Sequence, residues 1–192
     1  MSSSAAPTSP TAPKERLRIA SCSLAGCFGC HMSLLDLDEA LVDLMPFIDL
    51  DRTPLTDIKH VRAAGVDVGL IEGGVCNTEN VDVLREFRAR CRILVAVGAC
   101  AMYGGVPSLR NGIPVAGLVS EAYLKDGLFS PQVPSDPELP PLLKAVLPIH
   151  QVVKIDVTLP GCPPPAEAFR ALIIATLEGR PMTLAPADRR FD

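Results

Sequence analysis

The sequence lacks three features that would assign it to common functional classes. It has no run of basic residues, and its formal net charge is −4, so nothing indicates binding to nucleic acid or to an anionic membrane surface. Its longest apolar stretches, such as residues 93–97 and 171–177, are too short to cross a bilayer. The N-terminus contains neither an apolar core segment nor an adjacent arginine pair, and is therefore not expected to be an export signal. These absences predict a cytoplasmic protein without membrane contact.

The composition is that of a folded domain. The chain has 192 residues, of which 48% are hydrophobic and 21% charged, enough for one domain with a full core. Residues 1–14 are rich in Pro, Ser and Ala and are predicted to form a disordered tail, which leaves 15–192 as a single domain. Seven cysteines in a cytoplasmic chain are expected to be reduced, metal-bound or catalytic rather than joined in disulfides.

Short apolar runs alternate with segments of helical periodicity along the chain. Strands are predicted at 17–24, 48–51, 66–71, 93–97 and 152–159, and helices at 31–47, 77–90 and 164–177. This alternation predicts an α/β fold, a doubly wound parallel sheet of about five strands in flavodoxin-like order. Residues 104–148 are rich in Gly and Pro and are expected to form a long irregular loop, with a short helix at 139–146.

Four cysteines follow the ends of predicted strands. Cys27 and Cys30 come after the first strand, and Cys100 comes after strand 93–97. Cys162 comes after the last strand and is followed by proline. Because all strand-to-helix loops of a parallel sheet emerge at one edge, these thiols are expected to meet there. Four thiolates suit a zinc ion or a [4Fe–4S] cluster; one close pair plus two isolated cysteines is poor spacing for structural zinc, which favours the cluster.

The string CFGCH at 27–31 also has other interpretations. It matches the attachment site of a c-type haem, and its C-x-x-C matches a thioredoxin-like redox pair. Haem attachment normally takes place outside the cytoplasm, and a redox pair leaves Cys100 and Cys162 unexplained. We therefore expect His31 to begin a helix, where it either donates a hydrogen bond to a cluster sulfur or makes ordinary helix contacts.

The remaining candidates have an ordinary interpretation beside a functional one. Cys22, within a strand, and Cys91, on a helix face, are expected to be core residues, because free cysteines are among the most buried residue types. Cys76 lies in a Gly-rich stretch near the functional edge, and its role stays open. Glu72 follows the third strand at the same edge; it is either an ordinary loop carboxylate or a proton relay or charge beside the cluster.

Three segments resemble a known family. They are C-x-x-C at Cys27 and Cys30 with the MSLL that follows, GACAMYGGVP at 98–107, and PGCPP at 160–164. Together they resemble the small subunit of [NiFe]-hydrogenases, over residues 17–179, and Glu72-Gly73 resembles that family's E-G. The resemblance implies that Cys27, Cys30, Cys100 and Cys162 hold the proximal [4Fe–4S] cluster. It also implies an Ni–Fe centre in a separate large subunit, with this chain carrying electrons and performing no bond chemistry itself.

Departures from the family narrow the expectation. No cysteine follows Cys162, so one cluster is expected, as in soluble NAD-reducing hydrogenases that couple H₂ oxidation to NAD⁺ reduction. That type implies diaphorase partners, a flavin subunit and an iron–sulfur subunit. The quinone-facing cluster subunit of complex I is the alternative, but it typically has two adjacent cysteines where this chain has Cys27-Phe28-Gly29-Cys30. FMN is not expected in this chain, because the loop that holds phosphate in flavodoxins carries the cluster cysteines here.

Overall fold

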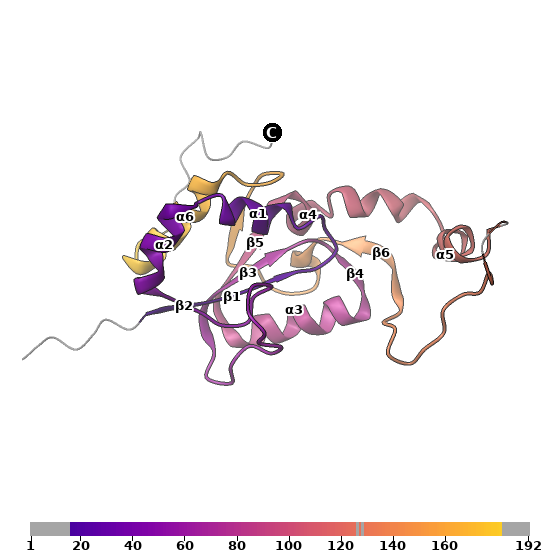
Figure 1. Ribbon diagram of the computed structural model, residues 1–192, viewed down its shortest axis with the longest axis horizontal. Coiled ribbons are helices and arrows are strands. Elements are labelled where there is room, and N and C mark those ends of the chain that lie inside the picture. Colours follow the sequence, from indigo (N-terminus) through magenta and orange to yellow (C-terminus); the bar gives the residue numbers. More distant parts are fainter. Residues whose placement is uncertain (1–15, 126, 128, 182–192) are drawn as a thin grey trace, which may run out of the picture.

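Five parallel strands form the central sheet, in the order β2-β1-β3-β5-β7 (Figure 1). They are β1 (Leu17–Ser23), β2 (Ile48–Leu50), β3 (Val66–Glu72), β5 (Cys91–Val97) and β7 (Val157–Leu159). The computed structural model describes residues 16–181 except 126 and 128, so the tail predicted at 1–14 lies outside the described residues. The predicted α/β class, the five strands and the flavodoxin-like order are confirmed.

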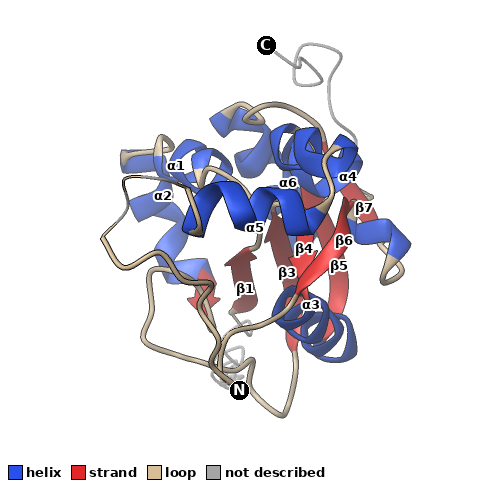
Figure 2. Cartoon of the chain, turned by 90° about the vertical axis from the view of Figure 1, so that its right-hand side faces the viewer, coloured by secondary structure: helices blue, strands red, loops and turns tan. Residues whose placement is uncertain are grey.

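Helices cover both faces of this sheet (Figure 2). One face is covered by α1 (Gly29–Leu35), α2 (Glu39–Leu44) and α6 (Ala166–Leu177), and the other by α3 (Thr78–Arg90). The helix α4 (Gly98–Tyr103) follows β5 directly. No helix among residues 16–181, with 126 and 128 set aside, is long and apolar enough to span a membrane.

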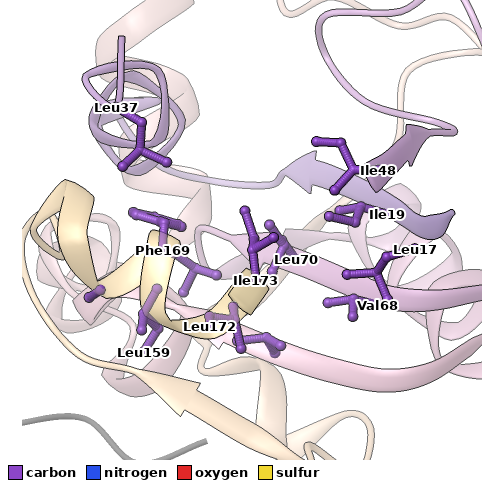
Figure 3. Close-up of a cluster of buried hydrophobic side chains, with 13 residues drawn as sticks. Leu17, Ile19, Leu37, Ile48, Val68, Leu70, Leu159, Phe169, Leu172 and Ile173 are labelled. Atoms are coloured by element: carbon purple, nitrogen blue, oxygen red, sulfur yellow. The ribbon is translucent and has the colours of Figure 1, made fainter. Parts of the chain in front are cut away.

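Each face of the sheet has its own hydrophobic core, because successive side chains of a strand point to opposite faces. Val68 and Leu70 of β3 pack with Phe169 of α6 (Figure 3). Ile71 faces the other way and packs with Phe87 of α3. Both phenylalanines are almost fully buried, and burying a side chain of this size contributes about 1.5–3 kcal/mol.

The helix predicted over 31–47 is wrong as one continuous element. It divides into α1, α2 and a short 3₁₀ segment, Met45–Phe47. Asp38 between α1 and α2 has a positive φ of 48°, which an α-helix does not accommodate. Pro46 then leads the chain out of α2 and into β2, because proline supplies no main-chain N–H for the helix.

The helix predicted at 139–146 is also wrong. This segment forms strand β6 (Leu142–Leu147), which pairs antiparallel with β4 (Val75–Asn77). The segment predicted as an irregular loop, 104–148, further contains a 3₁₀ helix (Val106–Gly112) and α5 (Val115–Tyr123). Figure 1 shows α5 standing away from the central sheet. The pairing of β6 depends on a partner 65 or more positions away, which local periodicity does not reveal.

Two smaller predictions also need correction. The last strand begins at Val157 rather than at residue 152. A 3₁₀ turn (Ile149–Gln151) precedes it. Just before the strand, the Asp156 side chain accepts a hydrogen bond from the Leu94 main chain at 2.9 Å. Cys91 is the first residue of β5 and does not lie on a helix face, although its predicted burial is confirmed at 5% exposure.

Candidate functional site

The N-terminus of α1 is capped by a side chain from another element. Its own N-cap residue, Phe28, has a left-handed backbone with φ 68° and makes no side-chain cap hydrogen bond. Glu72, the last residue of β3, takes over this role. Its Oε2 accepts from the His31 main-chain N–H at 3.1 Å, and its Oε1 accepts from that of Cys30 at 3.4 Å. A carboxylate therefore satisfies two N–H groups that a helix start leaves unpaired.

His31 extends this contact into a buried chain. Its Nδ1 lies 2.5 Å from Glu72 Oε2, and its Nε2 lies 3.0 Å from Ser21 Oγ. The Phe28 ring stacks on the imidazole, with ring centroids 4.7 Å apart. His31 is 6% exposed and Glu72 only 2% exposed. The ordinary-loop interpretation of Glu72 is therefore wrong, since the residue ends a strand and is buried.

The sequence contains a signal that Glu72 is buried. Glu72 is two residues after Leu70 in a strand, and side chains at that spacing share one face of the sheet. A carboxylate in phase with a core leucine indicates a buried polar contact, because an unpaired buried charge is too costly to keep. The identity of the partner, His31, follows only from the packing of α1 on that face.

The structure brings the four predicted cysteines to one edge of the sheet. Cys30 lies in the first turn of α1, Cys100 in α4 directly after β5, and Cys162 in the loop after β7. Cys27 and Cys162 are exposed, while Cys30 and Cys100 are half-buried. A main-chain hydrogen bond of 2.8 Å from Ala99 to Gly161 joins the start of α4, which carries Cys100, to the loop that carries Cys162.

Electrostatics show that these thiols influence one another. Burial raises the pKa of Cys30, and Glu72, Cys100, Cys27 and Cys162 raise it further. Burial likewise raises the pKa of Cys100; a hydrogen bond from the Val106 main chain opposes this shift, while Cys162 and Cys27 add to it. Four sulfurs that would repel one another as thiolates need a cation or a cationic metal group to be held ionised together.

Bare main chain lies against three of the sulfurs. A Cβ atom at Gly98, which has a φ of +79°, would lie 2.4 Å from Cys30 Sγ, and one at Gly105 would lie 2.7 Å from Cys100 Sγ. A Cβ at Gly29 would lie 3.2 Å from Cys27 Sγ. At Gly98 and Gly105 these distances are too short for a Cβ atom, so glycine is required there, whereas the contact at Gly29 is only tight. Four thiols, three of them with glycine main chain close to the sulfur, form a donor set and a cradle that fit an iron–sulfur cluster.

Among the residues that the structure describes, no group of three or more His, Cys, Asp or Glu side chains is placed to hold one metal ion. The three other cysteines have separate surroundings. Cys22 is buried in β1 as predicted, and Cys76 lies in β4, where its thiol contacts Asn80 Oδ1 at 3.2 Å. Burial raises the pKa of Cys22 and of Cys91 to about 12 in each case.

Comparisons with known proteins agree with this arrangement. Residues 27–176 match the family model described as NADH ubiquinone oxidoreductase, 20 Kd subunit. The chain is 40% identical over 183 residues to the delta subunit of the NAD-reducing hydrogenase HoxS of Cupriavidus necator, covering 92% of this chain and 86% of that protein. It is 31% identical over 187 residues to the gamma subunit of the coenzyme F420 hydrogenase of Methanococcus voltae, covering 88% of this chain and 68% of that protein.

Solved structures give the same result. A crystal structure of an NAD⁺-reducing [NiFe]-hydrogenase in the H₂-reduced state contains a chain with 49% identity and a TM-score of 0.89, covering 93% of this chain and 100% of that one. The [NiFeSe] hydrogenase from Desulfovibrio vulgaris Hildenborough matches with 21% identity and a TM-score of 0.56, covering 88% of this chain and 62% of that one. The second match shows the shared fold alone.

Proposed function

The chain belongs to the family of the NADH ubiquinone oxidoreductase 20 kDa subunit, within it to the small subunits of NAD-reducing [NiFe]-hydrogenases, and on that premise we propose that it carries electrons through one [4Fe–4S] cluster. In this proposal the chain lies between the Ni–Fe centre of a large subunit and a diaphorase with flavin and iron–sulfur subunits. The overall reaction would be H₂ oxidation coupled to NAD⁺ reduction. As a hydrogenase subunit, the chain is a component of an oxidoreductase.

The convergence of four cysteines from three loops is the observation that carries the proposal. Cys27, Cys30, Cys100 and Cys162 would hold the cluster at the shared edge of the sheet. When bound there, the cluster supplies a carrier that accepts and gives up one electron at a time. No residue of this chain is assigned a catalytic role, and flavin is assigned to the diaphorase rather than to this chain.

The contribution of the polypeptide is to bind and orient. Gly98 and Gly105 allow main chain to approach the sulfurs of Cys30 and Cys100 closely. A residue with a Cβ atom at either position would collide with the sulfur. The Val106 main chain donates to Cys100, and such hydrogen bonds to sulfur adjust the reduction potential of a cluster.

Metal and sulfide analysis tests the proposal. The complex that contains this chain is purified without oxygen, the chain is separated from its partners, and its own iron, sulfide and zinc are then quantified. We expect four iron and four acid-labile sulfide per chain and an electron paramagnetic resonance signal on reduction. One zinc without sulfide would contradict the proposal and support the structural zinc module.

The subunits that co-purify with this chain distinguish a hydrogenase subunit from a complex I subunit. The family model alone also permits a quinone-linked subunit of the complex I type. Two residues separate Cys27 from Cys30, and the identity to a hydrogenase delta subunit is 40%; both observations favour the hydrogenase. We expect a nickel-containing large subunit to co-purify with the chain. Membrane subunits with quinone reductase activity would instead support the complex I alternative.

A further inference from the structure

A buried hydrogen-bond chain runs from Ser21 through His31 to Glu72 and ends on the main chain of Cys30. We infer that His31 is a positioning residue, which orients the Glu72 carboxylate and thereby sets the placement and the electrostatic surroundings of Cys30. This inference rests on the proposed function, since it concerns the residue that would be a cluster ligand. It goes beyond that function in naming a group that would adjust the cluster without touching it.

The sheet fixes the positions of Ser21 and Glu72, the two side-chain partners of His31 in this hydrogen-bond chain. In the parallel pairing of β1 and β3, Ser21 is opposite Leu70 and Ser23 is opposite Glu72. Ser21 and Glu72 therefore project from the same face of the sheet, on neighbouring strands and two positions apart in register. The His31 imidazole enters from α1 and spans the two, using both ring nitrogens. A residue with one polar atom would reach only one of these partners.

Both oxygens of the Glu72 carboxylate have hydrogen-bond partners. Its Oε2 accepts from the main chain and contacts the ring of His31, while its Oε1 accepts from Cys30. The carboxylate therefore lies directly beside the first turn of α1, and it lines the same small cavity as Cys30. Any rotation of the carboxylate would therefore change both the helix start and the field at Cys30.

Two small cavities adjoin these contacts. A cavity of about 10 Å³ lies among Cys30, His31, Glu72 and the apolar side chains of Leu70, Val97 and Phe169. A second cavity, of about 30 Å³, touches Ser21 and His31 from the apolar side of α1 and α2. The first cavity has room for at most one water molecule. Hydrogen bonds in such enclosed surroundings are strong, and their loss is costly.

Two amide substitutions at His31 test its contacts with Glu72 and with Ser21 separately. In Asn the amide nitrogen is bonded to Cγ, as Nδ1 is in histidine, so His31→Asn can keep the donor to Glu72 and lose Ser21. In Gln the amide nitrogen lies near the place of Nε2, so His31→Gln can keep Ser21 and lose Glu72. Glu72→Gln removes the carboxylate charge itself. His60→Gln is a matched control, because the His60 side chain is 78% exposed.

The experiment uses the whole hydrogenase complex containing each variant. It measures iron and sulfide content, the midpoint potential of the cluster by paramagnetic resonance titration, and the loss of iron to a chelator. We expect His31→Gln to shift the potential downward, because the carboxylate charge beside Cys30 loses its ring donor, and Glu72→Gln to shift it upward. We expect His31→Gln to speed iron loss by about tenfold or more, with His31→Asn and His60→Gln close to wild type.

The outcomes separate this inference from the proposed function. Unchanged potentials in His31→Gln and Glu72→Gln complexes with full iron content would overturn the positioning role. Equal loss of iron and of melting temperature in His31→Asn and His31→Gln would overturn it too, because the side chain would then serve only the fold. If His31→Gln does not assemble but His31→Asn does, with the potential of the wild type, the contact with Glu72 is the one that matters and the positioning role stands; failure of both variants to assemble would overturn it. A wild-type complex without iron and sulfide in this chain would instead remove the proposed function.

Discussion

The main-chain N–H of Ala99 donates to the carbonyl oxygen of Gly161 over 2.8 Å. This single bond joins two segments that are 62 residues apart in sequence, the start of α4 and the loop after β7, and places the residues before Cys100 and Cys162 against each other. Gly98 lies at the same point, because a Cβ atom there would contact Cys30 Sγ at 2.4 Å and the Gly161 carbonyl at 3.5 Å. Three cysteine-bearing segments therefore meet around two glycines.

Removal of one proposed ligand is expected to separate hydrogenase from diaphorase activity. Cys162→Ala should abolish H₂-dependent NAD⁺ reduction and lower the iron content, since its thiol is one of four in the donor set. NADH oxidation with an artificial dye should persist, because that reaction needs only the diaphorase subunits. Both rates are measured on the purified complex, together with iron analysis.

Cys91→Ala is the matched control for this substitution. Cys91 is buried at the start of β5, and its removal should leave both activities while lowering stability by about 1 kcal/mol, the typical cost of a core change. Equal loss of H₂-dependent activity in the two variants would show that the assignment of ligand and core cysteines is wrong.

A methyl group at Gly98 is expected to disturb the site more than a methyl group elsewhere. In Gly98→Ala the new Cβ would collide with Cys30 Sγ, and the φ of +79° would be strained for alanine. We expect a loss of most cluster iron while the far-ultraviolet circular dichroism stays that of the folded chain. Gly112→Ala is the control, because a Cβ at Gly112 meets nothing within 4 Å. A Gly98→Ala complex with full iron content would contradict the close approach.

Alkylation should distinguish the core thiols from the edge thiols. The thiolate is the reactive form, and burial raises the pKa of Cys22 and Cys91 to about 12. At pH 8 only about one in ten thousand of these thiols is ionised, and at pH 10 about one in a hundred, which follows from the pKa difference. In the chain stripped of metal, iodoacetamide should therefore label the exposed Cys27 and Cys162 first. Mass spectrometry that finds Cys22 or Cys91 labelled first at pH 8 would refute the assignment.

The acid stability of the fold should depend on Asp51. This carboxylate is 2% exposed and accepts hydrogen bonds from the Arg62 main chain at 3.0 Å and from the Arg62 side chain. Burial alone would raise the pKa of Asp51, but the hydrogen bonds from Arg62 and from the Arg52 main chain outweigh it and hold that pKa below its ordinary value of 3.8. Asp51 therefore stabilises the folded state above its unfolded pKa, and this contribution is lost as the pH falls through the folded pKa.

Urea unfolding of Asp51→Asn tests that expectation. At pH 7 we expect the free energy of unfolding to fall by about 1.5–3 kcal/mol, the worth of a hydrogen bond to a charged group. The difference from wild type should narrow as the pH is lowered below 4. Asp57→Asn is the control, since the Asp57 side chain is 95% exposed. A difference that stays constant down to pH 2 would mean that the charge of Asp51 does not contribute.

Much of the fold was predictable because its signals are local. The apolar run at 93–97 and the alternation of strands with helices indicate a parallel sheet, and the strand order confirms it. The element that was mispredicted most clearly depends on a distant partner: residues 142–147 form a strand because they pair with β4. The helix predicted over 31–47 fails for a local reason, the positive φ of Asp38, which the apolar periodicity of that segment does not indicate.

The sequence by itself determined the architecture and which cysteines follow the strand ends at one edge of the sheet, because the period of apolar residues fixes the elements and parallel topology brings the segments after the strands to that edge. Only the tertiary structure decided how that edge is built. The contacts between His31 and Glu72, and between Ala99 and Gly161, join residues 41 and 62 positions apart. The interatomic distances in these contacts depend on how helices pack on the sheet to within an ångström. No periodicity in the sequence carries that information.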